Sequence, residues 1–143
     1  MKLEQKLNAE EITEFLDEVF PGAIEHFTIE DVGPMRARIR MPFQEWRLRP
    51  GGTISGPSLM TLADTALWVA LLAMIGREAL SVTSHLDIDF LRKPAPADVI
   101  AHTTLHKVGK RLAVGDVLMY SEGEAMPCAR ASVTYAIPSS YRG

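Results

Sequence analysis

The sequence predicts an α+β fold in which an antiparallel β-sheet wraps around one long, buried helix. The first observation is the segment at residues 55–75, which is apolar nearly all round the helix that it would form and therefore requires burial on every side. The second is a set of segments before and after it in which apolar and polar residues alternate, as is typical of strands. Short turns link the last four of these strands, and strands joined by short turns are antiparallel.

The chain is predicted to begin with an amphipathic helix. Apolar residues at helical spacing place this helix at residues 8–20, with Asn8 as its N-cap and Pro21-Gly22 as its stop. A short extended segment follows at residues 26–32, and the Gly33-Pro34 pair is typical of a turn.

The next strand is predicted at residues 35–43, where apolar residues alternate with three arginines. Pro42 indicates an edge position or the end of the strand. Residues 44–54 contain Pro50, Gly51 and Gly52 and are predicted to form a loop. Because alternation gives one buried and one solvated face, we interpret the arginines as a solvated face rather than a ligand site; they are Arg36, Arg38 and Arg40.

The central helix is predicted to run from Ser55 to Ile75, with Gly76 as its C-terminal stop. Pro57 fits the first turn, where its missing N–H costs no hydrogen bond. Asp64 is the only charged residue between Thr53 and Gly76.

Four alternating segments complete the chain, at residues 81–91, 98–108, 112–120 and 129–137. Gly109-Lys110 and residues 122–124 are typical of the hairpin turns between them. In the first segment, Thr83 and His85 fall on the polar face. The predicted apolar faces of the other three are Val99, Ala101, Thr103 and Leu105; Leu112, Val114, Leu118 and Tyr120; and Ala129, Ala131, Val133, Tyr135 and Ile137.

With 143 residues, the chain is expected to form one domain over residues 1–143. Its net charge of −3 argues against a nucleic-acid binder. The first 20 residues lack an apolar signal core, and the most apolar run, residues 65–75, is shorter than the about 20 residues that span a membrane. We therefore expect a cytoplasmic protein with no membrane contact. Cys128, the single cysteine, excludes an internal disulfide and is expected in the core.

Asp64 is the residue that this pattern leaves unexplained. A charge buried in apolar surroundings is costly unless it is paired or protonated, and aspartate has low helix propensity. One interpretation is structural, with Asp64 exposed at a helix bend or paired with an arginine of a neighbouring strand. The other is a functional acid held in a partly dry pocket. The residues alone leave both interpretations open.

Three segments resemble the PaaI-like (phenylacetate-degradation type) hotdog thioesterases. Residues 55–66 resemble a signature in which His-Gly-Gly opens the central helix and Leu-Ala-Asp follows seven residues later; here the second triplet ends at Asp64. Residues 88–92 and Gly109-Lys110 resemble two further segments, and the whole resemblance spans residues 35–137. It implies the hotdog fold. The sequence departs from the family at three positions, where Ser55 replaces the histidine, Pro57 the second glycine, and Arg49 an asparagine of some relatives.

The resemblance implies an acyl-CoA thioesterase that releases a free acyl or aryl-acyl acid and coenzyme A, with Asp64 as nucleophile or general base. The N–H of Gly56, at the helix start, is the expected donor to the carbonyl oxygen. Thr83 occupies the position at which some relatives carry a serine that helps to position water. Ser55, a candidate substrate-binding residue as well as the expected helix cap, lies about 13.5 Å from Asp64 along the helix, too far for both to act on one carbonyl. In hotdog enzymes a two-fold interface brings one subunit's aspartate near the other's helix start, so we predict an active homodimer, assembled further as a dimer of dimers, and an inactive monomer.

The remaining expectations concern ligands. The resemblance places the coenzyme phosphates near two basic pairs, Arg92-Lys93 and Lys110-Arg111. No cofactor is expected beyond the coenzyme A of the substrate. Two alternatives remain: a hydratase or dehydratase, which needs a histidine as well as an acid, and a non-catalytic acyl-CoA binder in which Asp64 is structural. Candidates for an apolar acyl pocket are Leu59, Met60, Leu67 and Trp68. The histidines are not grouped as metal ligands would be, so no metal site is predicted; they are His26, His85, His102 and His106.

Overall fold

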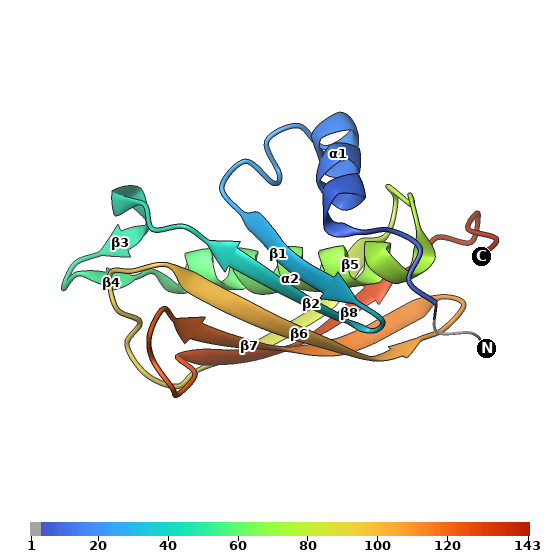
Figure 1. Ribbon diagram of the computed structural model, residues 1–143. Helices are drawn as coiled ribbons and strands as arrows, with labels where there is room; N and C mark the ends of the chain where they lie inside the picture. Colours follow the sequence, from blue (N-terminus) through green and yellow to red (C-terminus); the bar gives the residue numbers. More distant parts are fainter. Residues whose placement is uncertain (1–3) are drawn as a thin grey trace.

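The computed structural model describes residues 4–143, which form a six-stranded antiparallel sheet curved around one long helix (Figure 1). The strand order is β1–β2–β6–β7–β8–β5, and α2 contacts every one of these strands. This arrangement confirms the predicted α+β hotdog fold; residues 1–3 of the predicted domain lie outside the described part of the chain. The elements are α1 (Ala9–Val19), β1 (Thr28–Gly33), β2 (Arg36–Met41), the short 3₁₀ helix η1 (Glu45–Arg47), β3 (Leu48–Arg49), β4 (Thr53–Ile54), α2 (Gly56–Ile75), β5 (Val82–Phe90), β6 (Val99–Val108), β7 (Leu112–Ser121) and β8 (Ala129–Ala136).

The central helix α2 begins and ends where the sequence predicts. Ser55 is its N-cap and accepts a hydrogen bond from the N–H of Ser58, while Gly76 ends the helix with φ of +90°, a value that favours glycine. The helix is long and apolar enough to cross a membrane, but 78% of its most apolar 18-residue window is buried inside the fold. The sheet covers the apolar surface of α2, so α2 is the core helix of the domain.

Alternation is confirmed in β2, β6 and β8, whose apolar residues face α2. The three arginines of β2 lie on the outer face and pair with acids of neighbouring elements: Arg36 with Asp31, Arg38 with Glu30, and Arg40 with Glu30, Asp98 and Glu122. They form a solvated, paired face, as interpreted from the sequence. Pro42 follows the end of β2, and β1 rather than β2 lies at the sheet edge.

The predicted apolar face of β7 is wrong. Leu112 and Leu118 are 46% and 40% exposed, whereas the alternate residues from Ala113 to Ser121 are buried. The physical reason is the close approach of α2: a Cβ on Gly115 would lie 2.8 Å from Cδ2 of Leu67 and 2.6 Å from the carbonyl oxygen of Thr104. Position 115 therefore has no room for a side chain, and the inward face of β7 consists of Ala113, Gly115, Val117, Met119 and Ser121.

Two connections differ from the prediction. The segment predicted as extended at residues 26–32 begins with turns, and β1 starts only at Thr28. The predicted loop at residues 44–54 contains η1 and a small β3–β4 hairpin that leads into α2. Both segments matter for the site, because His26 and Phe27 contact η1, and η1 and the hairpin lead into α2.

Candidate functional site

Asp64 is half-buried and held by two hydroxyl groups from the sheet. Its Oδ1 accepts a hydrogen bond of 2.5 Å from Oγ1 of Thr83 and one of 3.0 Å from the hydroxyl of Tyr135. Neither donor is an arginine, so Asp64 is not part of an ion pair among residues 4–143. Within the same part of the chain, Oδ2 receives no hydrogen bond. One carboxylate oxygen is therefore fixed, and the other is left for a ligand or water.

Thr83 reaches Asp64 because β5 has a bulge. The pairing of β5 with β8 shifts between Thr83 and His85, so that Thr83 lies opposite Tyr135 and Leu86 lies opposite Val133. Tyr135 and Val133 both face α2. The extra residue in the bulge thus brings Thr83 onto the helix side of the sheet. The placement of Thr83 on a polar face with His85, which simple alternation predicts, is wrong.

Tyr135 is a site residue that the sequence reasoning missed. Burial and the charge of Asp64 raise the pKa of Tyr135 well above its ordinary value, so the phenol stays protonated and donates to Asp64. The available signal was its inward position in a strand, because a buried tyrosine hydroxyl needs a hydrogen-bond partner. Asp64 was the polar group on the facing helix.

An aromatic cluster lies beside this carboxylate. The ring of Trp68 stacks on that of Tyr135, with centroids 6.5 Å apart, and meets Phe20 at 6.1 Å. Trp68 is buried, and its Nε1 donates to no acceptor. Of the other predicted acyl-pocket residues, Leu59 and Leu67 are fully buried in the single chain, whereas Met60 is 42% exposed.

The start of α2 is distant from Asp64 in the same chain. Gly56 is the first helical residue, and Asp64 follows eight positions later, which corresponds to about 12 Å along the helix. Ser55 is occupied as the cap, and Pro57 has no N–H to offer. A Cβ on Gly56 would lie 3.4 Å from the ring of Phe90, at the far end of β5. The strand β5 thus runs from Asp64 at its beginning to the helix start at its end.

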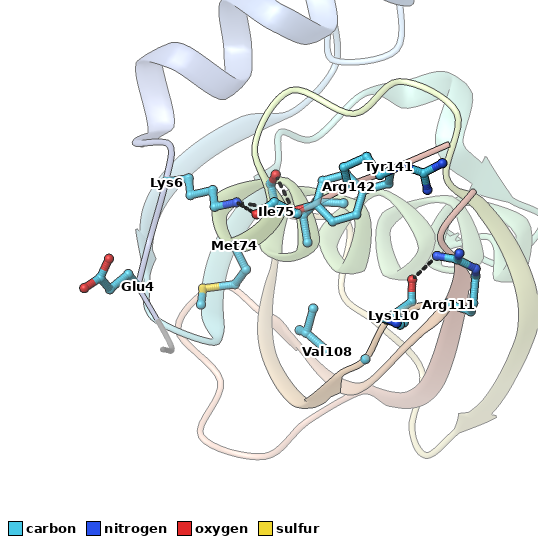
Figure 2. A pocket seen from close by; sticks show the side chains of 11 residues that line it. Glu4, Lys6, Met74, Ile75, Val108, Lys110, Arg111, Tyr141 and Arg142 are labelled. Atoms are coloured by element: carbon cyan, nitrogen blue, oxygen red, sulfur yellow. Dashed lines mark hydrogen bonds between the residues drawn. The ribbon is translucent and has the colours of Figure 1, made fainter. Parts of the chain in front are cut away.

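The two predicted basic pairs lie at opposite ends of the sheet. Arg92 and Lys93 are exposed just beyond β5, where Arg92 donates to the carbonyl of Pro127. Lys110 and Arg111 form the β6–β7 hairpin and line a cavity of about 570 Å³ at the C-terminal end of α2. Figure 2 shows them around this cavity with Lys6, Tyr141 and Arg142, and with apolar Met74, Ile75 and Val108.

Among the described residues, no group of three or more histidine, cysteine or acidic side chains is arranged to hold a metal ion. Cys128 is buried, and burial raises the pKa of its thiol, which leaves it as a small core residue.

Residues 51–128, which run from the β3–β4 turn through β7 and include Asp64 and Thr83, match the sequence profile of the thioesterase superfamily. The chain belongs to the thioesterase superfamily. A provisionally named thioesterase of Silicibacter sp. TM1040 is 42% identical, with a TM-score of 0.88 over 95% of each chain. A provisionally named esterase of Thermoplasma acidophilum is 24% identical over 78% of this chain and 83% of its own length. Thioesterase HI1161 of Haemophilus influenzae shares the fold, with 20% identity and a TM-score of 0.78 over 96% of this chain and 95% of its own.

Membership of the superfamily identifies a hydrolase fold whose relatives are named thioesterase or esterase, and it points to a thioester substrate. Tyr135, the second donor to Asp64, lies outside the matched segment. So does Arg47, a buried cation near the start of α2.

Proposed function

We propose that this thioesterase-superfamily chain is an acyl-CoA thioesterase of the PaaI type, with Asp64 as its catalytic carboxylate. The observation that carries the proposal is the pair of hydroxyl groups on Oδ1 of Asp64, which fixes one oxygen and leaves Oδ2 free. A carboxylate held in this way is oriented for reaction, since positioning a catalytic group lowers the entropic part of the barrier.

The reaction is hydrolysis of a thioester to a carboxylic acid and a thiol. As a general base, Oδ2 of Asp64 takes a proton from water while the water oxygen attacks the thioester carbon. As a nucleophile, the same oxygen attacks the carbon and water later cleaves the resulting anhydride. In both routes the C–S bond breaks, and the thiol leaves with a proton. The negative charge on the carbonyl oxygen needs fixed donors, for which the free N–H groups at the start of α2 are suited.

The single chain holds these two parts about 12 Å apart, and we infer that a dimer brings them together. Strand β5 is a nine-residue sheet edge with unpaired backbone groups, a surface that favours pairing with another strand. Antiparallel self-pairing centred on Leu86 would place Thr83 of one subunit opposite residue 89 of its partner. Because Phe90 contacts Gly56, this pairing brings Asp64 near the helix start of the partner. The apolar side chains exposed along this edge and its flanks are Met60, Leu80, Val82, Phe90 and Leu91.

The same pairing gives the coenzyme a basic environment. Thr83, Tyr135 and Ala113 lie side by side across β5, β8 and β7, so the hairpin at Lys110 and Arg111 lies just beyond Asp64 in the same subunit. In the antiparallel dimer, the partner's Arg92 and Lys93 come to this end as well. We therefore propose that the coenzyme phosphates bind at the cavity of Figure 2, where Lys6 and Arg142 add two further cations and Glu4 is the one acidic side chain among the residues that line it. A cytoplasmic location, where acyl-CoA is available, is part of the same proposal.

The decisive experiment is a thiol-release assay over a panel of acyl-CoA and aryl-acyl-CoA thioesters, with Asp64→Asn as the test variant. Asp17→Asn, an exposed aspartate of α1, is the matched control. We expect steady turnover by the wild type and by the control, and loss of turnover in Asp64→Asn with unchanged folding by circular dichroism. Tight binding of acyl-CoA without turnover by the wild type would instead identify a non-catalytic binder.

The phosphate site is tested by Lys110→Ala and Arg111→Ala, assayed on coenzyme A thioesters and on pantetheine thioesters that lack the phosphates. Loss of a charge-assisted contact is expected to raise KM for the coenzyme A thioester by roughly tenfold and to leave the pantetheine thioester unchanged. Lys107→Ala, on the exposed part of β6, is the control. Equal effects on both thioesters would remove these residues from phosphate binding.

A further inference from the structure

Arg47 is a buried cation without an acidic partner. Its side chain is only 3% exposed, and its Nε donates to no acceptor. No described carboxylate lies within ion-pair distance of its guanidinium, in contrast to the arginines of β2, each of which pairs with at least one acid. The contacts of the Arg47 guanidinium are aromatic: it lies 4.2 Å from the ring centroid of Trp46 and 5.5 Å from that of Phe27.

These contacts leave the charge of Arg47 only partly compensated. Two aromatic faces attract a guanidinium, but each does so far more weakly than the hydration that burial removes. Burial lowers the pKa of Arg47, yet an arginine keeps its proton in a protein. A buried charge that keeps its proton favours an anion as partner, and no described carboxylate lies within ion-pair distance of it.

The position of Arg47 indicates where that anion comes from. The carbonyl oxygen of Arg47 accepts a 2.8 Å hydrogen bond from the N–H of Ser55, which ties η1 to the start of α2. In the proposed dimer this helix start holds the thioester carbonyl, and the coenzyme extends away toward the Lys110–Arg111 end of the partner. The part of the substrate left on the Arg47 side is therefore the acyl group.

The local field favours a negative charge on that acyl group. The N-terminus of α2 carries the positive end of the helix dipole, and Arg49 adds an exposed cation two residues after Arg47. The rings of Phe27 and Trp46 supply apolar walls for a carbon chain or an aryl ring that ends in an anion. A guanidinium matches a carboxylate by donating two parallel hydrogen bonds.

On this basis, and resting on the function proposed above, we propose that Arg47 binds a carboxylate at the far end of the acyl group. The substrates would then be thioesters of dicarboxylic acids, each with one carboxyl group joined to coenzyme A and the other free. Arg47 is thereby a specificity-determining residue, and it takes no part in the proton transfers at Asp64.

The test compares thioesters matched in carbon number, such as glutaryl-CoA with valeryl-CoA and succinyl-CoA with butyryl-CoA. The wild type is expected to hydrolyse the carboxylated member with a kcat/KM at least tenfold higher. Arg47→Met keeps the apolar stem and removes the charge, and we expect it to lower this ratio by roughly 10- to 100-fold, the range for a lost ionic hydrogen bond. Arg36→Met, an exposed arginine on the outer face of β2, is the control and should keep the ratio.

A binding measurement separates this inference from the catalytic proposal. With Asp64→Asn as background, calorimetry should show tighter binding of glutaryl-CoA than of valeryl-CoA, and adding Arg47→Met should abolish the difference. If no thioester is hydrolysed but this binding preference is present, the catalytic proposal fails and the role of Arg47 stands. A preference for neutral acyl groups, or an unchanged ratio in Arg47→Met, would overturn the inference. So would dissociation of the dimer in Arg47→Met, because the anion would then be a carboxylate of the partner subunit.

Discussion

Removing the hydroxyl of Thr83 tests whether its hydrogen bond to the Asp64 carboxylate is needed for activity. Thr83→Val replaces the hydroxyl by a methyl group of similar size, so the 2.5 Å hydrogen bond to Oδ1 is lost with little change in packing. A hydrogen bond to a charged group contributes about 1.5–3 kcal/mol. If that energy orients Asp64 in the transition state, kcat/KM should fall by roughly 10- to 150-fold, because about 1.36 kcal/mol corresponds to a factor of ten.

The control for this prediction is Thr83→Ser, which keeps the hydroxyl and should keep most of the activity. The assay is thiol release under kcat/KM conditions, with thermal melting to confirm that each variant folds. The reasoning is refuted if Thr83→Val retains full activity while Asp64→Asn is inactive. Tyr135→Phe removes the second donor to the same oxygen, at 3.0 Å. The double variant should lose a different amount of activity from the product of the two single losses, because both hydroxyls act on one atom.

Three further predictions concern stability and assembly. Gly115→Ala should lower stability by about 1–3 kcal/mol, measured by urea unfolding, because the new Cβ meets a backbone oxygen at 2.6 Å. Val82→Lys with Phe90→Lys should yield an inactive monomer in sedimentation, since lysines block the pairing of an edge strand, whereas Val19→Lys on α1 should leave assembly unchanged. Hydrogen bonds from Arg40 and Arg38 hold the pKa of Glu30 below its usual 4.5. The ionised carboxylate of Glu30 therefore stabilises the fold above that pH, and this stabilisation is lost as the carboxylate is protonated. The difference in Tm between wild type and Glu30→Gln should accordingly shrink as the pH falls below 4.5.

The fold was predictable because its main signals are local. The uniform apolarity of α2, its serine cap and its glycine stop can each be recognised from neighbouring residues in the sequence. In β2, β6 and β8, the alternation of apolar and polar residues shows directly which face of the strand is buried. The face of β7 was not predictable in this way, because both of its faces carry apolar residues: Val117 and Met119 face inward, whereas Leu112 and Leu118 face outward.

The candidate site was predictable only at Asp64, whose charge is conspicuous in an apolar helix. Thr83 was selected by resemblance, but the bulge that turns it toward Asp64 depends on the pairing of β5 with β8, which local sequence does not specify. Tyr135 and Arg47 were missed for a related reason. Each becomes significant through what surrounds it in space: an aspartate 71 residues away for Tyr135, and the absence of a described carboxylate within ion-pair distance for Arg47.

The proposed division of the active site between two subunits has one consequence that no single-chain site would show. Asp64→Asn removes the carboxylate, while Gly56→Val places a branched side chain at the helix start, against Phe90, and should block the carbonyl position. Each variant alone should be inactive. In a dimer of one copy of each, one of the two sites combines the intact Asp64 of one chain with the intact helix start of the other. Because random exchange makes about half of the dimers mixed, unfolding and refolding the two variants together should restore about a quarter of wild-type activity. If the refolded mixture stays inactive although sedimentation shows dimers, both parts of the site belong to one subunit.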